Sequence, residues 1–134
     1  MRSPFERPAT CLITKGEAEP RNYAQIKNEI IQKVRDAVAA SVSIVQIREK
    51  RLTAKQVFEI ARNAVAIASQ SSTLILVNGR FDIALAAGAD GVHLPSDSVS
   101  PGDIRRVVPH GFIIGVSTHS ADEVLKARNT GADL

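Results

Sequence analysis

The chain has 134 residues, of which 44% are apolar and 23% are charged, a composition that is typical of a globular domain and excludes a disordered, collagen-like or disulfide-rich protein. Its net charge of +3 is too small to attract nucleic acid or membranes in general, so that any anion site has to be local. There is no Trp and only one Tyr, hence no aromatic platform for bases. We therefore expect one domain, with neither a nucleic-acid nor a membrane partner.

The single cysteine indicates a reducing compartment. Cys11 has no second thiol with which to form an internal disulfide or a redox pair. No apolar run approaches the roughly 20 residues that a membrane span needs, which together with the lone thiol predicts a cytoplasmic protein. Because Cys11 lies in the apolar run Ala9 to Ile13, we expect it to be a buried structural thiol.

Short apolar runs that alternate with longer stretches of helical period predict βα units and a parallel sheet. The runs are nearly continuous, as strands covered on both faces require. The predicted strands are Pro8 to Thr14, Val42 to Arg48, Thr73 to Val77, Asp90 to Leu94 and Gly111 to Ser117.

The helices between these strands are predicted from their N-caps, where a side-chain oxygen accepts hydrogen bonds from the amides of the first turn. Capping-box spacing, or a serine followed by proline, marks four starts: Asn22, Thr53, Ser100 and Ser120. After the first cap, apolar residues at a spacing of four predict a face that packs on a sheet: Ile26, Ile30, Val34 and Val38, widened by Ile31.

A short motif repeats along the chain: Gly88–Asp90 has the sequence Gly-Ala-Asp, and Gly131–Asp133 has it again two βα units later. Each glycine is predicted to take the left-handed conformation that ends a helix and lets the chain turn into a strand. By the same logic Leu134 begins a sixth strand.

Five βα units suit either a doubly wound sheet or an interrupted (β/α)₈ barrel, and spacing alone does not decide between them. A doubly wound sheet would carry a glycine-rich phosphate turn or an acidic cluster after its first strand. Thr14–Gly16 supplies neither, so the choice depends on the residues at the other strand ends.

The end of the second predicted strand is rich in donors. Ile44, Gln46 and Arg48 share one face, and Lys50 lies just beyond. A guanidinium fork and an ammonium group at the mouth of a barrel suit a phosphate or diphosphate. The alternative is that Arg48 to Arg51 is a solvated run of charges.

The later strands also end in polar groups. Asn78 follows the third strand, where the alternative is a plain turn. His93 is predicted to point inward, either as a hydrogen-bonded core histidine or as a proton carrier. Ser117 shares a face with Gly115, which leaves room below it, and without a base in triad order Ser117 is read as a ligand donor. The sequence therefore predicts a binding site, assigns no catalytic residue, and shows no metal-ligand spacing.

Four segments together resemble the thiamine phosphate synthase and TenI family: Val45–Lys50, Val77–Leu85, Gly91–Ser96 and Ile114–Ser120. The resemblance spans nearly the whole chain and implies a (β/α)₈ barrel. Residues 1–134 would then be the N-terminal part of that domain: about five βα units and the start of strand six, without the last three units.

The resemblance also implies roles for individual residues. Gln46, Arg48 and Lys50 match the group that grips a hydroxymethylpyrimidine diphosphate in the family's synthases. Asn78 matches an asparagine at the pyrimidine, and Ser117 matches a serine beside the diphosphate.

The departures from the pattern favour the tautomerase branch. Gly79 and Ser98 stand where the synthases have two aspartates that hold magnesium, whereas Asn78–Arg80 is similar to TenI. TenI aromatises a carboxylated thiazole phosphate by proton transfer and requires no metal. We therefore expect part of a thiazole tautomerase, without a cofactor. In the tautomerase branch the histidine that carries the proton follows strand six, so these five units are not expected to be active alone.

Three alternatives remain. One is a divergent thiamine phosphate synthase that uses Mg²⁺, one is a relative that binds phosphate esters without catalysis, and one is a fragment without function. In each functional case the partner is a small phosphate ester: the thiazole phosphate, or hydroxymethylpyrimidine diphosphate in the synthase. An open array of five strands exposes two apolar edges, from which we expect self-association into a homo-oligomer.

Overall fold

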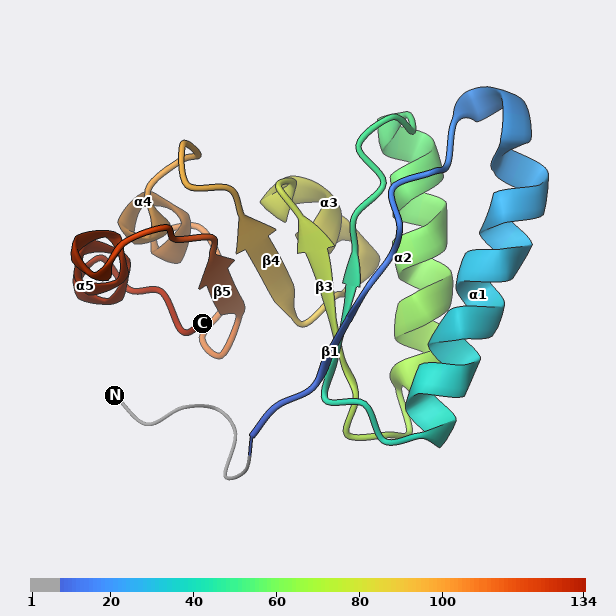
Figure 1. Ribbon diagram of the computed structural model, residues 1–134, viewed down its shortest axis with the longest axis horizontal. Coiled ribbons are helices and arrows are strands. Elements are labelled where there is room, and N and C mark those ends of the chain that lie inside the picture. Colours follow the sequence, from blue (N-terminus) through green and yellow to red (C-terminus); the bar gives the residue numbers. More distant parts are fainter. Residues whose placement is uncertain (1–7) are drawn as a thin grey trace.

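Strands and helices alternate along residues 8–134, the part of the chain that the computed structural model describes (Figure 1). The strands are β1 (Cys11–Ile13), β2 (Ile44–Ile47), β3 (Leu74–Asn78), β4 (Gly91–Leu94) and β5 (Ile113–Val116). The helices are a short 3₁₀ helix η1 (Pro20–Asn22), α1 (Tyr23–Ala39), α2 (Ala54–Ala68), α3 (Phe81–Ala87), α4 (Pro101–Arg105) and α5 (Ala121–Asn129). All five predicted strands are therefore present, and only β3 extends past its predicted end, to Asn78.

The five strands form one parallel sheet whose order follows the sequence, β1-β2-β3-β4-β5. Each strand pairs with its neighbour in the chain, with Ile47 opposite Val77 and Val77 opposite Val92. A doubly wound sheet reverses its strand order at a switch point. The sequential order excludes that arrangement and confirms the predicted α/β class with a parallel sheet.

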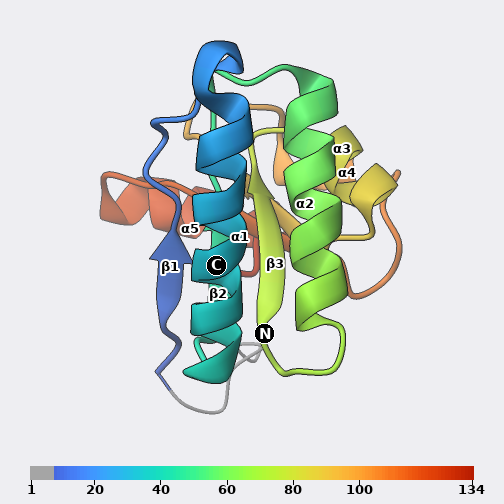
Figure 2. The ribbon, with the colours of Figure 1, turned by 90° about the vertical axis from the view of Figure 1, so that its right-hand side faces the viewer.

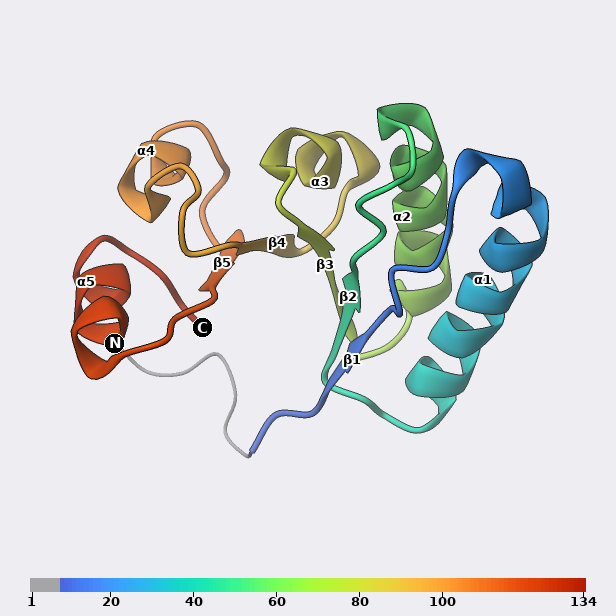
Figure 3. The same ribbon diagram turned by 45° about the horizontal axis from the view of Figure 1, so that its top comes forward.

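Helices α1 to α4 lie outside the curved sheet, and α5 continues the row beyond β5 (Figures 1 and 3). Figure 2 shows α1 and α2 side by side in front of the sheet. The face of the sheet that meets the helices has a fully buried centre, with Leu12 and Val116 partly buried at its two ends. The buried residues are Val45, Ile47, Ile75, Val77, Val92, Leu94 and Ile114. The opposite face has a smaller apolar cluster of Ile44, Leu76 and Ile113. Alternate residues of each strand belong to opposite faces of the sheet. The predicted alternation along the second strand is therefore confirmed.

Three of the four predicted N-caps are confirmed. A side-chain oxygen accepts from a first-turn amide at Thr53 (Gln56, 3.2 Å), Ser100 (Gly102, 3.3 Å) and Ser120 (Glu123, 3.2 Å). The cap predicted at Asn22 is wrong. Its Oδ1 accepts from the backbone N–H of Glu19 at 2.7 Å and closes η1, so this oxygen is turned away from the first turn of α1.

The repeated Gly-Ala-Asp motif has the same geometry in both places. Gly88 and Gly131 have φ of 73° and 101°, which confirms the left-handed turn after each helix. The aspartates carry a role that the sequence did not reveal. Each carboxylate accepts from a backbone N–H of the preceding strand, that of Ile75 at 2.7 Å for Asp90 and that of Ile114 at 2.9 Å for Asp133.

The predicted burial of Cys11 is wrong, because its side chain is exposed. β1 lies at the edge of the sheet, and only Leu12 of this strand packs toward the helices. Cys11 and Ile13 therefore lie on the opposite face, where Ile13 is 51% exposed. Across residues 8–134, no helix has both the length and the apolar character of a membrane span.

Candidate functional site

The carboxyl ends of β2 and β3 place two amide side chains in contact on the face opposite the helices. Asn78 Nδ2 donates to Gln46 Oε1 at 3.0 Å. Gln46 is only 4% exposed, whereas Asn78 is half-buried at the rim. This bond uses one acceptor of Gln46 and one donor of Asn78, so that the two amides fix each other's orientation.

A second polar pair lies on β4 and the segment after β5. His93 Nε2 is 3.0 Å from Ser117 Oγ. The backbone register places His93 opposite both Asn78 and Gly115, so the two polar pairs lie on the same face of the sheet, at the ends of neighbouring strands. The predicted inward direction of His93 is confirmed.

Gly115 makes room for the imidazole ring of His93. A Cβ atom added to Gly115 would lie 2.6 Å from His93 Nδ1, closer than real contacts allow. The space that was expected to lie free below Ser117 is thus filled by His93. Because the ring is half-buried, desolvation lowers the pKa of His93 below its ordinary value of 6.5. Burial thus favours the neutral ring, in which one nitrogen is able to accept a proton.

The two predicted cations follow β2. The backbone N–H of Arg48 donates to Thr14 Oγ1 at 2.8 Å, and Arg48 Nη1 lies 3.7 Å from where a Cβ of Gly16 would be, which places the guanidinium over the loop between β1 and α1. Lys50 is exposed. Within residues 8–134 neither side chain forms an ion pair, so both charges are open to an anion.

The alternative of a uniformly solvated charge run does not describe this segment. Arg51 Nη1 is 2.8 Å from Glu19 Oε1, and Glu49 is only 5% exposed. The four charges of the run thus lie in different environments.

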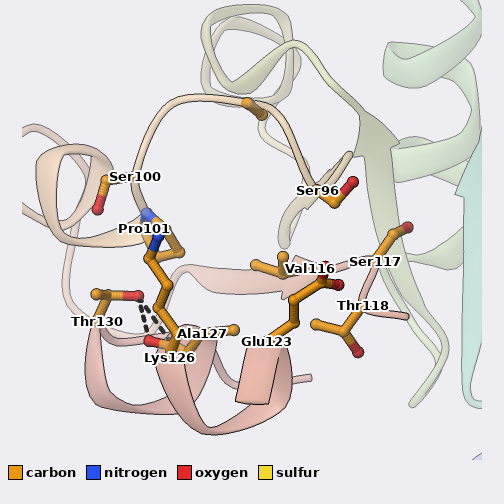
Figure 4. A pocket seen from close by; sticks show the side chains of 11 residues that line it. Ser96, Ser100, Pro101, Val116, Ser117, Thr118, Glu123, Lys126, Ala127 and Thr130 are labelled. Atoms are coloured by element: carbon orange, nitrogen blue, oxygen red, sulfur yellow. Dashed lines mark hydrogen bonds between the residues drawn. The ribbon is translucent and has the colours of Figure 1, made fainter. Parts of the chain in front are cut away.

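Two hollows open at this end of the sheet. The first, of about 320 Å³, lies between the ends of β2 and β3 and the helices α2 and α3, and is lined by Lys50, Asn78 and Arg80 together with Val57 and Ile83 of those helices. The second, of about 290 Å³, lies between the loop after β4 and helix α5 and includes Ser117. In Figure 4 the hydroxyls of Ser96 and Ser117 lie on one side of it and the Lys126 side chain on the other. Lys50 and Asn78 therefore share one hollow, and Ser117 lines the other.

Sequence reasoning missed three residues of this region: Thr14, Glu49 and Lys126. A signal existed for Glu49, since it follows Val45 and Ile47 at a spacing of two and so points to the same side of the strand, which faces the helices. A charged residue at such a buried position indicates a paired or hydrogen-bonded group. Lys126 carried no comparable signal, because helix α5 has no buried residue from which to read an inward face.

The described residues do not fit a magnesium ion held by carboxylates. Within residues 8–134, no group of three His, Cys, Asp or Glu side chains is placed to hold a metal ion. Gly79 and Ser98 have no carboxylate to offer, and the nearby Asp82 is paired with Arg80 at 2.7 Å.

Comparison with known proteins gives a consistent result. The family model described as thiamine monophosphate synthase matches residues 11–134. A putative thiamine-phosphate synthase 2 from Aquifex aeolicus is 38% identical over 130 residues, which are 97% of this chain and 66% of that protein. A thiamine-phosphate synthase from Chlorobium luteolum is 35% identical over 99% of this chain and 58% of its own length.

A solved structure of similar fold is a thiamine phosphate pyrophosphorylase from Pyrococcus furiosus, with a TM-score of 0.77 and 28% identity. The match covers 93% of this chain and 57% of that one. The chain thus spans between about half and two thirds of the proteins it resembles. Because the family model covers nearly all of the chain, the chain belongs to the thiamine monophosphate synthase family.

Proposed function

We propose that this chain forms the pyrimidine-diphosphate part of a thiamine-phosphate synthase site. The observation that carries the proposal is the hydrogen-bonded pair of Gln46 and Asn78 at the ends of β2 and β3. Arg48 and Lys50 follow the same end of β2 without an ion-pair partner among residues 8–134, and Lys50 shares a hollow with Asn78. The relatives named as synthases favour this activity over the tautomerase that the turn at Asn78–Arg80 suggested.

In this proposal each residue has a chemical task. The oriented amides of Gln46 and Asn78 hydrogen-bond the heteroatoms of the pyrimidine. Arg48 and Lys50 bind the diphosphate oxygens and stabilise the negative charge that develops as the bond between the pyrimidine methylene carbon and diphosphate oxygen breaks. Ser117, held by His93, donates its hydroxyl to the departing diphosphate. The thiazole nitrogen then forms the new bond to the methylene carbon.

The sheet in this proposal is an arc of a (β/α)₈ barrel, and residues 1–134 are one part of that barrel domain. The sequential strand order supports it, since a barrel adds each strand beside the last. At the outer edge of β5 the backbone N–H of Val116 donates to the carbonyl of Leu134 at 3.0 Å, a position that suits a following strand.

One observation favours thiazole tautomerisation as a second candidate function. Carboxylates are absent at Gly79 and Ser98, and a proton transfer places no demand on them. Under this alternative, His93, neutral and in reach of the rim, is the described group best suited to carry a proton.

Calorimetric titration of the 134-residue chain with hydroxymethylpyrimidine diphosphate tests the proposal. Arg48→Gln should weaken binding by at least about tenfold, since a charge-assisted hydrogen bond is worth about 1.5–3 kcal/mol. Arg62→Gln, on the exposed side of α2, is the matched control and should bind like the wild type. Equal affinity of the Arg48 variant and the wild type would contradict the proposal. Binding of the carboxylated thiazole phosphate, with none of the pyrimidine diphosphate, would support the tautomerase instead.

A further inference from the structure

Glu49 is a buried carboxylate between two open cations. It is 5% exposed, and its neighbours in sequence are Arg48 and Lys50. A carboxylate taken out of water needs hydrogen-bond donors or a counter-ion. Within residues 8–134 Glu49 has no ion-pair partner, so the cations beside it do not supply that need.

Neutral donors from the loop between β1 and α1 satisfy Glu49 instead. Thr14 Oγ1 donates to Glu49 Oε2 at 2.5 Å, and the backbone N–H of Gly16 donates to the same oxygen at 2.9 Å. The backbone N–H of Ala18 donates to Oε1 at 2.9 Å. Gly16 has φ of 76°, a conformation that side-chain-bearing residues seldom adopt. One carboxylate thus fixes three positions of the loop that follows β1.

The same loop is joined to two residues of the proposed site. Thr14 Oγ1, besides donating to Glu49, accepts from the backbone N–H of Arg48 at 2.8 Å. The backbone N–H of Thr14 donates to the carbonyl of Gln46 at 3.0 Å. The loop also lies against the guanidinium of Arg48, near Gly16. Glu49, the loop and the end of β2 therefore form one hydrogen-bonded unit.

We propose that Glu49 is a positioning residue, which holds the β1–α1 loop against the end of β2 and so directs Arg48 toward a bound diphosphate. It draws its hydrogen bonds from neutral donors and leaves the positive charge of Arg48 to the ligand. The identity of the ligand rests on the function proposed above, whereas the positioning rests on the contacts of Glu49.

In Glu49→Gln, the loss of charge and the loss of positioning should change the affinity for an anion in opposite directions. Loss of a negative charge beside two cations would by itself tighten the binding of an anion. Loss of the positioning role would weaken the binding, because the glutamine amide presents an NH₂ group where Oε1 or Oε2 of Glu49 now accepts a hydrogen bond from the loop. We expect inorganic diphosphate to bind Glu49→Gln roughly tenfold more weakly than the wild type, as one lost charged hydrogen bond implies. The assay is calorimetry on the full chain.

Glu17→Gln is the matched control, because Glu17 is exposed on the same loop and the substitution removes the same charge. This variant should bind diphosphate as the wild type does, or slightly tighter. Thr14→Val removes the hydroxyl that links Glu49 to Arg48 and should weaken binding, whereas Thr14→Ser keeps the hydroxyl and should restore it. Wild-type or tighter binding by Glu49→Gln would overturn the proposal.

A measurement without ligand separates this proposal from the proposed function. In NMR relaxation, the Arg48 Nε–H should be ordered in the wild type and more mobile in Glu49→Gln, while circular dichroism shows both chains folded. If the wild type binds no diphosphate, the proposed function fails, and the mobility of Arg48 alone decides the role of Glu49. Equal mobility in the two chains would overturn it.

Discussion

The contact between Gly115 and His93 allows a quantitative prediction for Gly115→Ala. The new Cβ would lie 2.6 Å from His93 Nδ1, 3.4 Å from Cε1 and 3.5 Å from Cγ. The added carbon faces a ring, and the ring has to tilt or shift to accommodate it. Such a shift breaks the 3.0 Å contact between His93 Nε2 and Ser117 Oγ.

Three contributions set the size of the effect. Overpacking of this kind costs about 1–3 kcal/mol. The lost hydrogen bond costs about 1 kcal/mol. Replacing glycine by alanine in a strand offsets about 0.5–1 kcal/mol through the entropy of the unfolded chain. The free energy of unfolding should therefore fall by about 2 kcal/mol.

Urea denaturation followed by far-ultraviolet circular dichroism measures this change. Gly102→Ala is the matched control, because its Cβ would meet nothing closer than 3.5 Å and α4 would gain a better helix former. That variant should be more stable by about 0.5–1 kcal/mol. In the background of His93→Ala, the Gly115→Ala change should lose most of its cost. Unchanged stability of Gly115→Ala, or an equal cost in the His93→Ala background, would refute the reasoning.

Three further predictions concern stability. Because burial lowers the pKa of His93 in the folded state, the unfolded chain binds a proton first as pH falls through 6.5. Stability should therefore fall as the pH drops below about 6.5, and His93→Gln should flatten that fall in urea titrations. Asp90→Ala removes the acceptor for the Ile75 N–H and should cost about 1 kcal/mol in the same assay, with Asp97→Ala on the following loop as a neutral control. Thr53→Ala removes a reciprocal cap and should cost about 1 kcal/mol, and no loss would contradict the capping role.

Much of the fold was predictable because its signals are local. The alternation of Ile44, Val45, Gln46 and Ile47 follows from strand geometry, and the caps at Thr53 and Ser120 follow from side chains that bond within their own turn. The placement of Gln46 and Asn78 on a common face needed only the parity of two strands. Whether these side chains bind the predicted ligand remains a prediction.

The predictions that were wrong or absent depend on contacts between distant parts of the chain, or on competing hydrogen bonds. Asn22 had the right spacing for a cap, but its side-chain oxygen accepts a hydrogen bond from the backbone N–H of Glu19 instead. Cys11 lies in an apolar run, and only the position of β1 at the edge of the sheet exposes it. Glu49 could not be assigned a role because its donors come from Thr14 to Ala18, a loop distant in sequence.

An NMR titration of the full chain with inorganic diphosphate tests the shared site most directly. The side-chain amide signals of Gln46 and Asn78 and the backbone signals of Arg48 and Ser117 should shift together and fit a single dissociation constant. Shifts confined to Lys126 and the α5 side, or separate constants for the β2–β3 rim and Ser117, would show that these groups do not act on one ligand.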